Sequence, residues 1–175
     1  DQVYEFSTYR KKFHAMIEAV DTEIGRILMG IEDDVLQRTT VMYLSDNGSP
    51  ADGIGPPWNP SRSKGTLYEG GVNVPLIVTG PLVATPGSTI DAMVHFVDLF
   101  PTIAEIAEVD LTTPMGMDNA PIALDGVSFL PHLTEADDPN PRTLLFTESF
   151  SPNGPGPYTY HRTMIRDGTW KYYTK

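Results

Sequence analysis

The chain contains no cysteine among its 175 residues. Disulfides, cysteine-ligated zinc and a thiol nucleophile are therefore excluded. No apolar run approaches the roughly 18 residues of a membrane-spanning helix, and no signal peptide opens the chain. The first residue is Asp1 rather than methionine, which suggests a processed or truncated product. The missing signal therefore does not identify a compartment.

Basic residues are scarce, since 12 Lys and Arg stand against 23 Asp and Glu and the formal net charge is −11. Non-specific nucleic-acid binding needs basic patches, and anionic membranes attract basic segments. We therefore do not expect nucleic acid or an anionic membrane as a partner, and a solvated acidic surface is the simpler interpretation of the charge. With 40% hydrophobic residues, the chain can bury the core of one domain.

Hydrophobic residues recur with a helical period over residues 4–32. They fall at steps of three or four and share one face: Phe13, Ile17, Val20, Ile24, Leu28 and Ile31. Two apolar runs, 39–44 and 74–78, predict buried strands. We expect these strands to be neighbours in one mainly parallel or mixed sheet, with the helix packed on a face.

The region after residue 80 predicts a second helix and a terminal hairpin. Asp98 is interpreted as the N-cap of the helix. Its buried stripe is predicted to be Ile103, Ile106 and Ala107. Residues 143–147 predict another strand, and an Asp-Gly pair between runs 162–166 and 169–174 is a strong hairpin signal. The sequence thus predicts an α/β fold followed by a small antiparallel subdomain.

The densest chemical signal is Ser45-Asp46-Asn47-Gly48, directly after the first buried strand. Ligand sites of open α/β sheets lie just beyond such strand ends. The Asp46 carboxylate and the Asn47 amide offer hard oxygen ligands that suit calcium or magnesium. An ordinary turn is the alternative, because Asp, Asn and Gly are common turn residues.

A second signal begins at Lys64, which enters the glycine-rich stretch 64–75, Lys-Gly-Thr-Leu-Tyr-Glu-Gly-Gly-Val-Asn-Val-Pro. Glycine lets backbone approach a bound anion closely, and lysine supplies a compact positive charge. The long irregular loop over residues 47–72 is itself typical of a functional segment. A flexible loop with a solvated lysine is the alternative.

Together, the two segments resemble the sulfatase family of the alkaline-phosphatase superfamily. That family combines a strand ending in S-D-N-G, an irregular loop, and K-G-x-x-x-E-G-G-x-x-V-P before the next strand. Similar elements lie on both sides: I-G-R-I-L at 24–28, V-D-x-x-P-T-I at 97–103, D-G-x-S at 125–128 and R-x-G-x-x-K-Y at 166–172. The resemblance spans nearly the whole chain.

The resemblance implies a part of a sulfatase-type mixed sheet flanked by helices. Residues 1–135 would be the C-terminal part of the catalytic α/β domain, and 136–175 the start of the small C-terminal subdomain. Asp46 and Asn47 would ligate a divalent metal, most often calcium, and Lys64 would contact the sulfate as a catalytic and substrate-binding residue. The nucleophile would be a formylglycine made from Cys or Ser within C/S-x-P-x-R.

The chain departs from that pattern at the nucleophile. The nearest local match is Trp58-Asn59-Pro60-Ser61-Arg62, and tryptophan cannot become formylglycine. We therefore interpret the chain as a fragment of a sulfatase with an incomplete metal site, and we expect it to be inactive by itself. Its parent would hydrolyse sulfate esters.

Other assignments stay open at this level. The alternatives are a phosphonate monoester hydrolase or phosphodiesterase of the same superfamily, or a non-catalytic binding or structural fragment. The substrate would be a small sulfate ester or a sulfated sugar, and the oligomeric state is open. Arg62 and His161 are further candidates for substrate binding, whereas His95 and His132 have no partner that the sequence names. The resemblance suggests a periplasmic or secreted protein.

Overall fold

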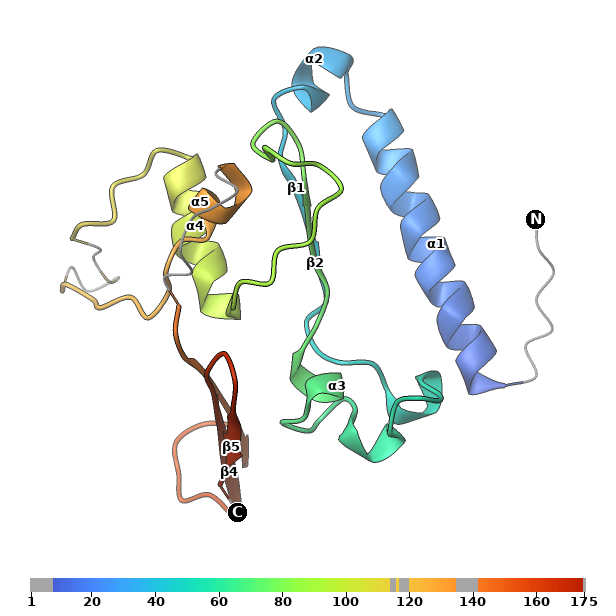
Figure 1. Ribbon diagram of the computed structural model, residues 1–175, viewed down its shortest axis with the longest axis vertical. Coiled ribbons are helices and arrows are strands. Elements are labelled where there is room, and N and C mark those ends of the chain that lie inside the picture. The colour runs from blue at the N-terminus through green and yellow to red at the C-terminus, as the bar shows by residue number, and fades with distance from the viewer. Residues whose placement is uncertain (1–7, 114–115, 117–119, 135–141, 175) are drawn as a thin grey trace. The chain divides into compact units, whose positions relative to one another are not determined.

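The computed structural model describes residues 8–113, 116, 120–134 and 142–174. The chain divides into two compact units, one of residues 1–81 with 149–161 and the other of residues 82–148 with 162–175 (Figure 1). The predicted domain boundary between residues 135 and 136 lies outside the described residues and stays a prediction. Among the described residues, no helix has both the length and the apolar character that a membrane crossing needs.

The predicted first helix is confirmed as α1, Tyr9–Met29, the long helix of Figure 1. The Thr8 side chain caps its first turn by accepting a hydrogen bond from the Lys11 backbone N–H at 3.4 Å. At the other end, the Gly30 N–H donates to the Ile27 carbonyl at 3.0 Å. A short helix, α2 (Asp33–Leu36), follows. Residues 4–7 of the prediction lie outside the described residues.

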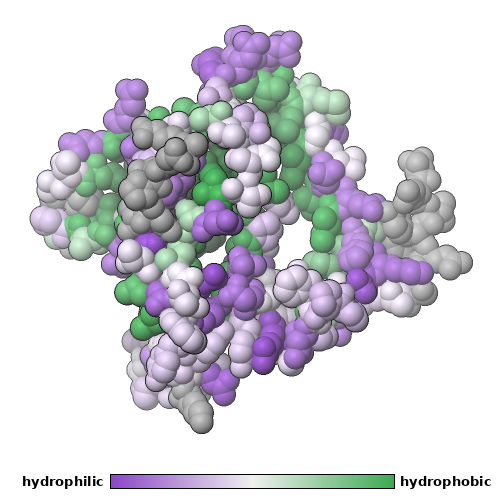
Figure 2. Space-filling view, in the orientation of Figure 1, coloured by the Kyte–Doolittle hydropathy of each residue, from purple (hydrophilic) through white to green (hydrophobic). Residues whose placement is uncertain are grey.

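The apolar stripe of α1 is only partly covered in the described chain. No residue of α1 is buried, and Ile17 and Val20 are 50% and 47% exposed. The ring of Phe13 lies against Gly53 in the short helix η1, Ala51–Gly53. Figure 2 shows apolar residues, in green, at the surface of the drawn face. The predicted stripe is therefore covered only in part: its other residues, Phe13, Ile24, Leu28 and Ile31, are half-buried. Periodicity identifies an apolar face but not how much of it a neighbouring surface covers.

The two predicted strands of this unit are confirmed as neighbours. β1 (Val41–Leu44) and β2 (Leu76–Thr79) form a two-stranded sheet. The pair is antiparallel, so the parallel alternative is wrong for these strands. Leu44, the last residue of β1, pairs with Leu76, the first residue of β2. Residues 45 and 75 consequently leave the sheet at the same edge, and the loop between them begins and ends there.

The second unit contains η3 (Phe96–Asp98), α4 (Leu99–Ile106) and α5 (Leu130–Thr134). The predicted stripe of α4 is wrong, because Ile103 is 54% exposed, Ala107 is exposed and Ile106 is half-buried. Thr102 and Ala104 are the buried residues of α4 instead. The Thr102 hydroxyl donates to the Asp98 carbonyl at 2.6 Å and accepts from the Phe129 N–H at 3.0 Å. The buried face of α4 is therefore the one that carries the hydrogen-bonded Thr102, whereas its large apolar residue Ile103 is exposed.

The C-terminal strands form a sheet in the order β3 (Leu145–Ser151), β4 (Tyr160–Arg166) and β5 (Lys171–Tyr173). β4 and β5 are antiparallel, with Met164 opposite Tyr173, which confirms the predicted hairpin. Met164 is 2% exposed. The Asp167 carboxylate closes the turn by accepting from the N–H groups of Thr169 and Trp170 at 2.7 and 2.6 Å. The described chain is thus an α/β protein with antiparallel sheets.

Candidate active site

The first candidate segment is the turn that follows β1. Its backbone starts at the sheet, where the Ser45 N–H donates to the Pro75 carbonyl at 3.4 Å. The Ser45 hydroxyl then donates to the Asn47 carbonyl at 2.7 Å, which bends the chain over two residues. Asp46 is exposed, whereas Asn47 is half-buried. The turn therefore holds both predicted metal ligands at the edge of the β1–β2 sheet.

The second candidate segment is the turn around Lys64, whose side chain is exposed. Ser63, directly before it, is only 3% exposed, and its hydroxyl donates to the Pro60 carbonyl at 2.6 Å. The carbonyl of Ser63 accepts two hydrogen bonds from Thr66, from the hydroxyl at 2.7 Å and the N–H at 3.1 Å. Lys64 thus projects to solvent from a turn whose backbone is fixed on both sides.

Backbone hydrogen bonds join the two segments. The Lys64 N–H donates to the Ser49 carbonyl at 3.0 Å, and the Gly48 N–H donates to the Gly71 carbonyl at 3.1 Å. Gly71 belongs to the short helix α3, Glu69–Val72. The structure therefore brings together the segments that carry Asp46, Asn47 and Lys64, which stand almost 20 residues apart in the sequence.

The structure places Arg62 in the same loop as Lys64. It ends the short helix η2 (Pro60–Arg62), and its guanidinium lies over the ring of Tyr68, 4.7 Å from the ring centroid. Such a contact holds the charge by cation–π attraction. The side chain is exposed, so the charge also faces solvent next to the Lys64 turn.

His161 lies elsewhere, on β4, within a cluster of aromatic rings. Its ring is 5.2 Å from that of Tyr158 and 6.3 Å from that of Phe150, measured between centroids. The rings of Phe150 and Tyr158 are 5.0 Å apart. Tyr158 is 41% exposed, so the cluster presents an aromatic surface. Its role in substrate binding stays a prediction.

The local match to the nucleophile motif has a structural role in the described chain. Asn59 caps η2, because its side-chain oxygen accepts from the Ser61 N–H at 3.0 Å and from the Ser61 hydroxyl at 2.8 Å. Trp58 is 67% exposed at the surface of this loop. With tryptophan at the nucleophile position, this segment supplies no precursor of formylglycine.

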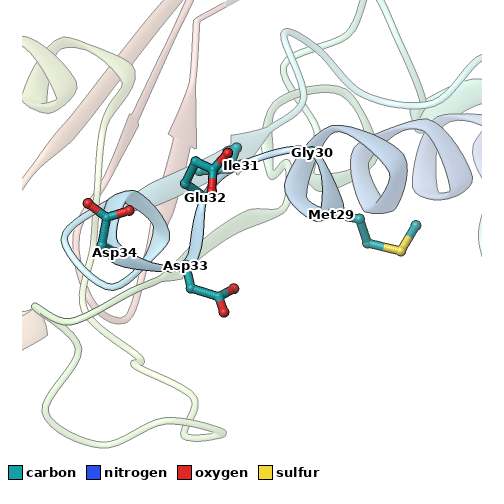
Figure 3. Close-up of a pocket in the computed structure, with 6 residues that line it drawn as sticks. All are labelled: Met29, Gly30, Ile31, Glu32, Asp33 and Asp34. Atoms are coloured by element: carbon teal, nitrogen blue, oxygen red, sulfur yellow. The ribbon is translucent and has the colours of Figure 1, made fainter.

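Residues 29–34, from the end of α1 to the start of α2, line an open pocket of about 510 Å³ that includes Glu32, Asp33 and Asp34. Figure 3 shows that the carboxylates of Asp33 and Asp34 point to different sides rather than toward one point. Throughout the part of the chain that the structure describes, no three His, Cys, Asp or Glu side chains are grouped as a metal would require. Asp46 and Asn47 offer two side chains only, and their role as metal ligands stays a prediction.

The sequence missed a buried charged network in the second unit. Asp98 is 2% exposed and forms a two-point salt bridge with Arg142, whose Nε lies 2.7 Å from Asp98 Oδ2 and whose Nη2 contacts Oδ1. Asp98 also accepts from the backbone N–H groups of His95 at 2.7 Å and Val127 at 2.8 Å. Asp98 is the N-cap residue of α4, as predicted, but its side chain makes no capping bond to that helix and is used in this network instead.

This network determines the ionisation of Asp98. Burial acts to raise the pKa of its carboxyl group. The hydrogen bonds from Arg142, Val127 and His95, together with the Arg142 charge, outweigh burial and hold the pKa below its ordinary value. His95, for which the sequence named no partner, bonds through Nε2 to the Phe146 carbonyl at 2.8 Å and accepts at Nδ1 from the Val97 N–H at 3.3 Å.

Comparisons with known proteins agree with the residue patterns. The family model described as Sulfatase matches residues 3–109. A sulfatase from Formosa agariphila is 41% identical over 114 residues, which are 58% of this chain and 20% of that protein. Arylsulfatase K from Gallus gallus is 31% identical over 176 residues, which are 97% of this chain and 30% of that protein.

A solved structure supports the fold. The phosphonate monoester hydrolase SpPMH from Silicibacter pomeroyi superimposes with a TM-score of 0.67 and 24% identity, over 89% of this chain and 30% of that protein. The chain thus spans between a fifth and a third of the length of the proteins that it matches.

Proposed function

Because the chain belongs to the sulfatase family, we propose that it forms the Lys64 side and part of the metal side of an active site that hydrolyses sulfate esters. The observation that carries this proposal is the pair of backbone hydrogen bonds, Lys64 to Ser49 and Gly48 to Gly71, that join the two candidate segments. They join the segments that carry a carboxylate, an amide and a cation next to the carboxyl end of β1, and open α/β sheets bind ligands beyond the carboxyl ends of their strands.

Lys64 would bind the sulfate group of the substrate. Its ammonium group is a compact charge with three hydrogen-bond donors, and its exposed position leaves those donors available for sulfate oxygens. Negative charge on these oxygens and on the leaving oxygen changes as the S–O bond breaks. A fixed cation that interacts best with the transition state raises the rate rather than the affinity alone.

Asp46 and Asn47 would hold a divalent cation, with calcium the first choice. Their donor atoms fit that group, because carboxylate and amide oxygens are the ligands that hard cations prefer. A bound cation would offset negative charge on the sulfate oxygens. Calcium takes about 6–8 oxygen ligands, so two side chains are too few and the remaining ligands must come from other polypeptide or from water.

The nucleophile must likewise come from residues outside these 175. The sequence has no cysteine, and the Pro-Ser-Arg segment forms the short helix η2, with Trp58 at the nucleophile position of the motif. We propose a formylglycine, on the strength of the family patterns described above. The isolated chain would then hydrolyse no sulfate ester above the background rate.

The nature of the substrate is proposed at the level of a sulfate ester, either a small aryl ester or a sulfated sugar. Two curated relatives carry the names sulfatase and arylsulfatase K, which favours sulfate over phosphonate. The likeness to the phosphonate monoester hydrolase concerns the fold, so a phosphonate monoester belongs in the assay as the competing substrate. A periplasmic or secreted location is proposed with the family, and cell fractionation of the source organism tests it.

The test uses the full-length enzyme that contains this chain, with calcium supplied and an aryl sulfate as substrate. We expect Lys64→Ala to lower turnover by about 10²–10³-fold, the usual cost of one positioned electrostatic donor. Arg38→Ala is the matched control, because within the described residues the hydrogen bond of this exposed cation is to the nearby Asp34 carbonyl, at 3.3 Å. Wild-type turnover by Lys64→Ala would disprove the proposed role, and faster hydrolysis of an aryl phosphonate monoester would favour the competing activity.

A further inference from the structure

We propose that Gly48, Gly70 and Gly71 form a backbone clamp that positions Lys64 relative to Asp46. The inference rests on the proposed function, since it concerns how the same site is held in shape. The three glycines lie in two different segments, and each is in close backbone contact with a segment that it does not belong to. They act through the backbone and need not contact the substrate.

Three segments stack on one another in this clamp. Gly48, in the turn after β1, lies against Gly70 and Gly71 at the start of α3. Gly71 in turn lies against the carbonyls of Ser63 and Thr66, in the turn that carries Lys64. The Lys64 N–H closes the cycle by donating to the Ser49 carbonyl at 3.0 Å. Every segment thus contacts the other two through main-chain atoms.

The contacts leave no room for a side chain. A Cβ atom on Gly48 would collide with the Gly70 carbonyl oxygen and lie 2.7 Å from the Gly71 Cα. A Cβ on Gly71 would collide with the Thr66 carbonyl oxygen and lie 2.7 Å from that of Ser63. These neighbours are backbone atoms that cannot turn away, so any larger residue must push the segments apart. Neither glycine has a positive φ, so close approach rather than backbone conformation explains them.

The separation of these segments sets the separation of the functional groups. Asp46 precedes Gly48 by two residues within a turn held by the Ser45 hydroxyl. Lys64 directly follows Ser63, in the turn that the Ser63 hydroxyl holds. A displacement of the segments therefore moves the base of Lys64 relative to Asp46. Misplacing a catalytic group by about 1 Å can cost about 10²-fold in rate.

The experiment is a double-mutant cycle in the full-length enzyme, with turnover of an aryl sulfate at saturating calcium as the readout. Gly48→Ala should lower kcat by about 10–10²-fold. Gly168→Ala is the matched control, because a Cβ at that exposed turn glycine meets nothing within 4 Å, and it should stay within about twofold of wild type. Circular dichroism and thermal melting establish that each variant is folded.

Coupling separates positioning from general damage. If the clamp acts by positioning Lys64, then Gly48→Ala should lower kcat little further once Lys64→Ala has removed the ammonium group. The kcat of the double variant should then be at least about tenfold higher than the value obtained by multiplying the two single-variant losses. Gly168→Ala should instead combine with Lys64→Ala multiplicatively.

A milder variant covers the case in which Gly48→Ala does not fold. Ser63→Ala removes the hydroxyl that bonds the Pro60 carbonyl beside Lys64, and we expect about a fivefold loss of kcat that also couples to Lys64→Ala. The clamp is wrong if the losses multiply, or if both Gly48→Ala and Ser63→Ala keep wild-type kcat, while Lys64→Ala lowers turnover by about 10²–10³-fold as expected. An active Lys64→Ala would instead overturn the proposed function, and the clamp with it.

Discussion

Removal of Arg142 tests whether the buried pair with Asp98 stabilises the second unit. The Asp98 carboxylate is 2% exposed, and the Arg142 side chain is 14% exposed. Arg142→Ala leaves the buried carboxylate without its cation. It also removes donors from the carbonyls of Asp125, at 2.9 Å, and Leu144, at 3.4 Å.

The magnitude follows from what remains around Asp98. Breaking one half of a buried ion pair costs about 3–5 kcal/mol. Two backbone N–H groups, those of His95 and Val127, continue to bond the carboxylate, so we expect the lower end, about 3 kcal/mol. For a protein of this size that corresponds to a loss of roughly 6–12 °C in Tm.

The matched control is the exposed ion pair of α1. Arg26 Nε lies 2.7 Å from Glu23 Oε2, but the two side chains are 68% and 58% exposed. Such pairs contribute about 0.3–0.5 kcal/mol, so Arg26→Ala should scarcely change the free energy of unfolding. Urea unfolding at pH 7 compares the two variants. An equal, small effect of both would refute the view that burial makes the Asp98–Arg142 pair important.

The pH dependence gives a second check. The folded-state pKa of Asp98 lies below its unfolded value, so its contribution to stability is present above the unfolded pKa and is lost as the pH falls through the folded pKa. The ordinary pKa of this carboxyl is about 3.8. Without the cation, burial should raise the pKa of Asp98 above that value. The difference in stability between wild type and Arg142→Ala should therefore narrow as the pH falls from the raised pKa of the variant to the lowered pKa of the wild type. A gap that stays constant down to pH 3 would contradict this account.

Three further outcomes are expected. Isothermal titration calorimetry of the isolated chain should detect no tight calcium binding, because Asp46 and Asn47 supply too few ligands, and a tight site would contradict the incomplete donor set. In the full-length enzyme, Asp46→Ala should raise the calcium concentration for half-maximal activity more than Asn47→Ala does. A larger increase for Asn47→Ala would contradict Asp46 as the stronger metal ligand. Thr102→Val should cost about 1–3 kcal/mol in urea unfolding, because the Phe129 N–H loses its acceptor in a buried position; Thr22→Val, at an exposed hydroxyl of α1, should not.

Local patterns were sufficient to predict most elements of the fold. The period of α1, the apolar runs of β1 and β2, and the Asp-Gly pair of the β4–β5 hairpin each depend on neighbouring residues, and each is present. Burial was not predictable in the same way. Ile17 and Ile103 belong to apolar patterns yet are half exposed, because burial depends on which surface meets the pattern.

The site was predictable as a set of segments but not as a geometry. The residue patterns identified the segments around Asp46 and Lys64, and the structure joins them by backbone hydrogen bonds. The glycine-rich stretch predicts room for an anion, whereas in the structure Gly48 makes room for the backbone of α3, and Gly71 makes room for the carbonyls of Ser63 and Thr66. Arg142 lies 44 residues from Asp98 in the sequence, so a local pattern such as a helix cap could not identify it as the partner.

The separation of Asp98 and Arg142 has a consequence for how this part of the chain tolerates changes in length. The salt bridge closes a loop of 44 residues. Loop-closure entropy grows with the logarithm of loop length, so even a doubling of this loop costs only about 0.6 kcal/mol. That is a fraction of the roughly 3 kcal/mol expected for the pair. An insertion next to Asp110, which is exposed, should therefore leave the salt bridge in place, and this position is suitable for a reporter peptide.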